Sequence, residues 1–181
     1  MVIETSFAGA GLVFAHQMGS AEFYWAIAAE LFLLLWTALL LLAPRWSGSD
    51  IRGWRFRLVG FGAAVLASLL TLAGKTLEVW PDHPLFPSGH TAYAVTIAVF
   101  LVGWDRRWLR WVIPLLGLLG VALVLSFFHV PADIAGGTVV GLVVGVSFFR
   151  RLERSERRRL GTRTPSPGAT SVGPAREASS G

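Results

Sequence analysis

Five apolar stretches dominate this sequence, and each comes close to the length that a helix needs to cross a bilayer. They lie at about residues 23–43, 58–74, 88–104, 111–128 and 132–149. A helix rises about 1.5 Å per residue, so about 20 apolar residues span the roughly 30 Å of hydrocarbon in a membrane. The third stretch is the shortest and reaches the far side only if its helix begins near Ser88. We therefore expect an all-α, polytopic membrane bundle with about five transmembrane helices.

The composition agrees with lipid as the main solvent of the chain. Of its 181 residues, 54% are hydrophobic and 15% are charged, whereas a soluble domain has about 45–50% and about 25%. These values argue against soluble, secreted and nucleic-acid-binding classes of protein. The chain contains no cysteine, which excludes disulfides and thiolate metal sites.

The arginines set the expected orientation in the membrane. They fall in three segments only, at residues 45–57, residues 106–110 and from residue 150 onward. With five spans, these alternate segments lie on one side, and short loops rich in arginine stay in the cytoplasm. We expect a multi-pass protein of the cell membrane with its N-terminus outside and its C-terminus in the cytoplasm.

The two ends of the chain differ from the apolar middle. Residues 1–20 are apolar in patches but carry Glu4, His16 and Gln17, which favours a helix lying on the membrane surface. Without a basic residue before the first apolar run, a cleaved signal peptide is disfavoured. We divide the chain into a membrane domain at 1–150 and a basic, disordered cytoplasmic tail at 151–181.

Two features inside the spans are read mainly as structural. Gly137, Gly141 and Gly145 recur every four residues and form a smooth stripe for close helix packing. Glu30 is an acid inside the first span and hence a functional candidate. A structural role, hydrogen-bonded within the bundle, is favoured because no motif surrounds it.

Lysine and histidine occur at only five positions, and all of these map to the side opposite the arginines. They are His16, Lys75, His83, His90 and His129. Imidazole transfers protons near neutral pH, and protonated nitrogens bind anions. The sequence therefore predicts that any chemistry takes place at the outer face.

Two of the histidines stand where helices are expected to begin. Ser88 is the expected N-cap of the third span, followed by Gly89 and His90. The free backbone N–H groups of such a first turn attract anions.

The last span begins in a similar way. Pro131 fits a first helical turn, and Asp133 lies about one turn after His129, where a carboxylate can orient the imidazole. Lys75 stands at the outer end of the second span. Two helix starts with histidines and one lysine together predict a site for a phosphate group.

These residues resemble the type 2 phosphatidic acid phosphatases, an all-helical membrane family related in fold to vanadium haloperoxidases. The family's site combines a lysine upstream of Arg-Pro, then Pro-Ser-Gly-His, then Ser-Arg shortly before His-x-x-x-Asp. The sequence Pro87-Ser88-Gly89-His90 matches the second motif completely, and His129-Val130-Pro131-Ala132-Asp133 resembles the third from its histidine onward. The chain looks most like the small bacterial undecaprenyl diphosphate phosphatases of this family.

The resemblance implies a membrane phosphoric ester or diphosphate hydrolase that uses a phosphohistidine intermediate, with no metal or other cofactor. It implies that His129 attacks phosphorus, that Asp133 orients His129, and that His90 protonates the leaving group. The phosphate-binding groups implied are Lys75, Ser88, Gly89 and, as a further cationic candidate, His83. The implied partner is a membrane lipid of the polyprenyl diphosphate or phosphatidic acid type, and not a nucleic acid.

The chain departs from the family at both arginines. The first should fall near Asp82 or His83, and the Ser-Arg pair falls on Ala122-Leu123. An alternative is therefore a weak or inactive member that binds lipid phosphates or acts as a partner in a membrane complex. A lipid phosphotransferase would use the same intermediate, and a zinc site at the histidines is the least favoured alternative because helix ends and glycine suit phosphate better.

Overall fold

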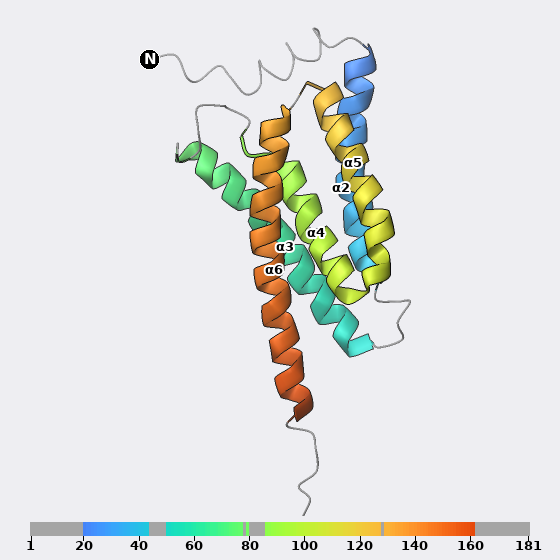
Figure 1. Ribbon diagram of the computed structural model, residues 1–181, viewed down its shortest axis with the longest axis vertical. Helices are drawn as coiled ribbons and strands as arrows, with labels where there is room; N and C mark the ends of the chain where they lie inside the picture. Colours follow the sequence, from blue (N-terminus) through green and yellow to red (C-terminus); the bar gives the residue numbers. More distant parts are fainter. Residues whose placement is uncertain (1–19, 44–49, 78, 80–85, 128, 162–181) are drawn as a thin grey trace, which may run out of the picture.

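The computed structural model describes residues 20–43, 50–77, 79, 86–127 and 129–161, which fold into a bundle of helices (Figure 1). None of these residues lies in a strand, so the predicted all-α class is confirmed. The surface helix expected within residues 1–20 falls, apart from Ser20, outside the described residues. The α-helices are α2 (Ser20–Leu42), α3 (Asp50–Thr76), α4 (Gly89–Trp104), α5 (Leu109–Leu125) and α6 (Pro131–Gly161), with a short 3-10 helix, η2 (Arg106–Trp108), between α4 and α5.

Four of the described helices are long and apolar enough to cross a membrane. The segments concerned are Phe23–Leu42, Gly53–Thr76, Arg106–Leu125 and Pro131–Arg159. The fifth expected span corresponds to α4, which has 16 residues and is the shortest of the α-helices. The predicted order of apolar helices is therefore confirmed, with the expected short member in third place.

Two helices extend beyond the apolar stretches that predicted them. Helix α3 starts at Asp50, and its first turns contain Phe56, which is buried against Phe100 of α4. Helix α6 continues through the basic segment to Gly161. Within this extension, an ion pair between Glu156 and Arg55 joins α6 to α3. The predicted boundary at residue 150 thus falls inside a continuous helix, and residues 162–181 lie outside the described residues.

Helix α4 forms the centre of the bundle. It packs against α2, α3, α5 and α6, and most of its side chains from Thr91 to Leu101 are buried. Its ends are set by local hydrogen bonds: the Ser88 hydroxyl accepts from the Thr91 amide at 3.3 Å, and the Asp105 amide donates to the Leu101 carbonyl. The predicted N-cap is therefore confirmed. Because protein surrounds α4, the helix does not have to face lipid along its length.

The glycine stripe of α6 lies directly against α4. A Cβ atom added to Gly137 would lie 2.3 Å from the Ser88 carbonyl oxygen, and one on Gly141 would lie 2.6 Å from the Ala92 carbonyl oxygen. At Gly145 the nearest atom would be the Val99 Cβ at 3.0 Å. At Gly137 and Gly141 a larger side chain would collide with backbone oxygen atoms, and at Gly145 its contact with Val99 would be tight. The interpretation of these glycines as a packing surface is confirmed.

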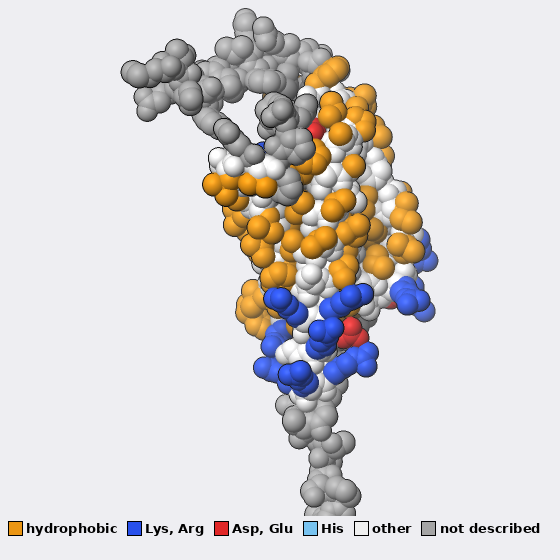
Figure 2. All heavy atoms as spheres, turned by 60° about the vertical axis from the view of Figure 1, so that its left-hand side comes forward, with side chains coloured by type: hydrophobic (Ala, Val, Ile, Leu, Met, Phe, Trp, Pro, Cys, Tyr) orange, Lys and Arg blue, Asp and Glu red, His pale blue; other side chains and the backbone are white. Residues whose placement is uncertain are grey.

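Charge divides the molecule along its long axis. On the face seen in Figure 2, hydrophobic side chains cover the middle, and the basic side chains gather toward the end where α6 finishes. The alternating directions of the helices bring the α4–α5 connection to that same end (Figure 1). The starts of α4 and α6 and the end of α3 lie at the other end. The candidate site residues and the arginines are thus separated by the length of the bundle.

Candidate active site

A buried histidine and a buried aspartate stand at the start of α6. The Nδ1 atom of His129 lies 3.2 Å from Oδ2 of Asp133. The same oxygen accepts a hydrogen bond from the Val130 amide at 3.1 Å, so Asp133 also satisfies a backbone donor at the helix start. Pro131 occupies the first helical position, where its missing N–H costs nothing. Local helix geometry therefore explains why the carboxylate meets this imidazole.

The electrostatic surroundings favour the neutral form of His129. Burial lowers its pKa below the usual value, because removal from water disfavours the charged ring. The hydrogen bond and negative charge of Asp133 oppose that effect, and the nearby His90 and Lys75 reinforce it. A neutral imidazole whose Nδ1–H donates to a carboxylate keeps a lone pair on Nε2 and can act as a nucleophile.

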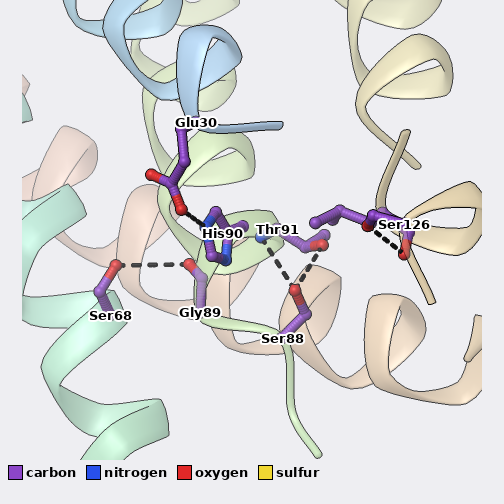
Figure 3. Close-up of polar contacts among 8 residues, drawn as sticks. Glu30, Ser68, Ser88, Gly89, His90, Thr91 and Ser126 are labelled. Atoms are coloured by element: carbon purple, nitrogen blue, oxygen red, sulfur yellow. Dashed lines mark hydrogen bonds and ion pairs between the residues drawn. The ribbon is translucent and has the colours of Figure 1, made fainter. Parts of the chain in front are cut away.

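The start of α4 is tied to the start of α6. The Ser88 amide donates to the backbone carbonyl of Asp133 at 2.9 Å, which joins the two helix starts directly. Figure 3 shows the Ser88 hydroxyl turned toward Thr91, from whose hydroxyl it accepts at 3.1 Å. The Gly89 carbonyl accepts from the Ser68 hydroxyl at 3.3 Å. The predicted phosphate-binding residues Ser88 and Gly89 thus form a fixed link between α3, α4 and α6.

The imidazole of His90 lies beside that of His129. The two ring centres are 6.2 Å apart, with the planes at 64°. On its other side, His90 Nε2 lies 3.0 Å from Oε1 of Glu30, which comes from α2 (Figure 3). Sequence reasoning favoured a structural role for Glu30 and did not place it beside a predicted catalytic residue. An acidic residue within an apolar span marks Glu30 as a functional candidate, but it does not identify His90 as its partner.

Of the two remaining predicted phosphate ligands, the structure describes Lys75 but not His83. Lys75 lies in the last turn of α3, partly buried, and its charge acts on both Asp133 and His129. His83 lies outside the described residues. Across the described ranges, no three His, Asp or Glu side chains are grouped as they would be to hold a metal ion.

Comparison with known proteins gives the family. The sequence profile of the PAP2 superfamily matches residues 68–157, which include Lys75, Ser88, His90, His129 and Asp133. These residues belong to the PAP2 superfamily. The family resemblance predicted from the two motifs is therefore confirmed.

A second match is to the undecaprenyl-diphosphatase BcrC of Bacillus subtilis (strain 168). The identity is 35% over 66 residues, which make up 36% of this chain and 34% of that protein. The match thus spans about a third of the length of this curated relative. No solved structure matches the chain significantly.

The PAP2 segment carries an apolar residue where the family motif has its second arginine. Leu123 is fully buried, and its carbonyl accepts from the His129 amide at 3.2 Å. Its side chain therefore offers no donor to a phosphate.

In the part of the chain that the structure describes, Lys75 is the only lysine, and the arginines lie in the three segments grouped at the other end.

Proposed function

We propose that this chain is an integral membrane phosphatase that hydrolyses a phosphate monoester or diphosphate of a lipid through a phosphohistidine on His129. The PAP2 match and the similarity to an undecaprenyl-diphosphatase support a lipid phosphate as the substrate. The observation that carries the mechanism is the buried His129–Asp133 pair facing His90. Substrates of the polyprenyl diphosphate or phosphatidic acid type fit this chemistry, with their chains in the bilayer.

In the first step, Nε2 of His129 attacks phosphorus while the bond to the leaving oxygen breaks. The Nδ1–H group remains hydrogen-bonded to Asp133, whose negative charge stabilises the imidazolium that forms. His90 gives a proton to the departing oxygen. Lys75 and the N–H groups at the start of α4 stabilise the charge that builds up on the non-bridging oxygens.

In the second step, water attacks the phosphohistidine. His90, neutral after the first step, accepts a proton from this water while the bond between His129 and phosphorus breaks. Inorganic phosphate leaves, and both histidines return to their starting protonation states. His83, which precedes α4 in the sequence, is a further candidate for phosphate binding.

The distribution of charge supports an extracytoplasmic site. The arginine-rich end of the bundle has the composition of a cytoplasmic surface. The two histidines lie at the opposite end, at the starts of α4 and α6. In this orientation the substrate reaches the site from the outer leaflet.

One observation favours a second candidate, a protein that binds lipid phosphates with little or no turnover. The arginine position of the third motif holds the buried Leu123. Losing one preorganised donor to a developing charge costs about 2.7–4 kcal/mol, or roughly a hundred- to a thousandfold in rate. The first motif also lacks its arginine, so catalysis here depends on Lys75 and the helix ends.

The test is phosphate release from a panel of lipid phosphates by the purified protein in detergent. The panel contains a long-chain prenyl diphosphate, a prenyl monophosphate and phosphatidic acid. We expect slow, chelator-insensitive release by the wild type and an acid-labile phosphoenzyme, with both lost in His129→Ala. Binding of these lipids without turnover would establish the second candidate instead.

A further inference from the structure

Glu30 is a carboxylic acid at an unusual place in the fold. It lies within the apolar segment Phe23–Leu42 of α2, one of the four helices suited to cross a membrane. Its side chain is 64% exposed in the protein. The side chains around it line a small groove of about 260 Å³ and are otherwise apolar, namely Ala26, Ile27, Leu31 and Leu34. Its hydrogen-bond partner on α4 is the imidazole of His90.

The charge of Glu30 and the charge of His90 stabilise each other. An isolated carboxylate in hydrocarbon is unfavourable, because the charged group loses its contacts with water. A protonated imidazole at 3.0 Å offsets much of that cost through a charge-assisted hydrogen bond. The protonated state of His90 is therefore the one that matches an ionised Glu30.

The groups at the pair of histidines come from α2, α3, α6 and the residues just before α6. Glu30 of α2 contacts one ring nitrogen, and His129 faces the ring from the turn before α6. Asp133 of α6 is hydrogen-bonded to His129, and the charge of Lys75 in α3 interacts with both Asp133 and His129. Oδ2 of Asp133 contacts His129 and the Val130 amide, and Oε1 of Glu30 contacts His90 directly.

We propose, on the basis of the phosphatase function above, that Glu30 is a positioning residue for His90. A carboxylate can only accept, so the Nε2–H group of His90 donates to Glu30. That contact fixes the ring and leaves Nδ1 as the nitrogen that exchanges protons with the leaving group and water. Glu30 touches neither phosphorus nor the leaving oxygen, and its effect passes through His90.

The proton balance of this arrangement is complete. Protonated His90 carries one proton on Nε2, held by Glu30, and one on Nδ1. The Nδ1 proton moves to the leaving oxygen as the bond from that oxygen to phosphorus breaks, which leaves neutral His90 with its proton on Nε2. In the second step Nδ1 takes a proton from the attacking water. Glu30 stays ionised throughout.

The kinetic test compares Glu30→Gln with the wild type on two monophosphates in the same detergent. A long-chain alkyl phosphate has a poor leaving group and depends on protonation, whereas nitrophenyl phosphate leaves without it. Because a general acid contributes about 10²–10⁴-fold, we expect kcat/KM on the alkyl phosphate, which reports the steps up to the phosphoenzyme, to fall by about tenfold or more. On nitrophenyl phosphate we expect kcat/KM to change by less than about threefold, because its leaving group departs without a proton.

Thr37→Val is the matched control for helix packing. The Thr37 and Tyr93 hydroxyls form a second hydrogen bond between α2 and α4, at 2.8 Å and about one helical turn after His90. If Glu30 only joined these helices, Thr37→Val would reproduce its effect. Equal losses on both substrates in Glu30→Gln, or a leaving-group effect in Thr37→Val, would overturn the proposal.

A second measurement does not depend on turnover and separates this proposal from the proposed function. In protein labelled with ¹⁵N-histidine, the neutral His90 ring should carry its proton on Nε2, with the signal assigned by its loss in His90→Asn. Glu30→Ala should lower the fraction of this tautomer and remove the hydrogen-bond shift of its Nε2 signal, and Thr37→Val should do neither. Neutral wild-type His90 with its proton on Nδ1 would refute the role of Glu30. Absence of phosphatase activity with the Nε2 tautomer present would refute only the proposed function.

Discussion

At the scale of single residues, the charge state of His129 results from two opposed influences. Burial favours the neutral ring, and Asp133 favours the charged one, with burial the larger of the two. His129 is therefore neutral near pH 7. In the proposed mechanism it has a stabilising partner at the moment when attack makes it positive. A solvent-exposed histidine would lack the first property, and a histidine in a purely apolar pocket would lack the second.

The pH dependence follows from the direction of this shift. Attack requires neutral His129, so kcat/KM should fall as pH drops through the pKa of that group. Because burial lowers the pKa, we expect the acid limb below the ordinary histidine value of about 6.5. In Asp133→Asn the opposing influence is lost, so the limb should move to still lower pH while kcat falls. A pH–rate profile measures both, and a wild-type acid limb above about pH 7 would contradict the assignment of His129.

Sequence reasoning predicted the site residues whose neighbours are local. Ser88 caps its own helix, and Asp133 meets His129 one turn away, so spacing along the chain is sufficient. The contact between Glu30 and His90 joins residues 60 positions apart. It depends on how α2 is rotated against α4, and spacing along a single chain does not contain that information. The burial of Leu123 is a tertiary property of the same kind.

At the scale of elements, glycine contact between α4 and α6 holds the two histidines in register. Gly137 lies against the carbonyl of Ser88, the residue that caps α4. The packing surface and the site therefore share the same backbone atoms. A change in helix spacing there would also move His90 relative to His129.

We predict that Gly137→Ala destabilises the protein by about 1–3 kcal/mol, the usual cost of overpacking. The new Cβ would lie 2.3 Å from the Ser88 carbonyl oxygen, so the helices must separate. Gly117→Ala in α5 is the matched control, because nothing lies within 4 Å of its added Cβ. That variant should be neutral or stabilised by up to about 1 kcal/mol through helix propensity. Thermal unfolding in detergent, followed by tryptophan fluorescence, compares them, and equal stability of the two variants would refute this packing role.

The helix ends show where hydropathy is a poor guide. The apolar stretch of α3 was expected from residue 58, whereas the helix starts at Asp50. Charged residues dilute the hydropathy of the first turns, but Phe56 is buried between Phe100 and Trp104. Hydropathy locates the part of a helix that meets lipid. It does not locate the part that packs on another helix at the membrane surface.

At the scale of the whole molecule, orientation is the property on which the substrate's leaflet depends. We expect the starts of α4 and α6 outside and the end of α6 in the cytoplasm. The chain has no cysteine, so single cysteines can be introduced at Leu85 and Gly161 without background. The cysteine at position 85 should react with an impermeant thiol reagent in intact cells, and the one at 161 only after lysis. The reverse pattern would place the site on the cytoplasmic side.

The shortness of α4 has a consequence for the lipid itself. Its 16 residues cover about 24 Å, roughly 6 Å less than the hydrocarbon core. With Asp105 at one boundary of the bilayer, Ser88 and His90 lie about one helical turn inside the other. A phosphate therefore has to sink only by about the depth of a headgroup, and its chain stays among other chains. Drawing that chain into water would cost about 0.8 kcal/mol for each methylene, whereas water is small enough to travel inward to the phosphate.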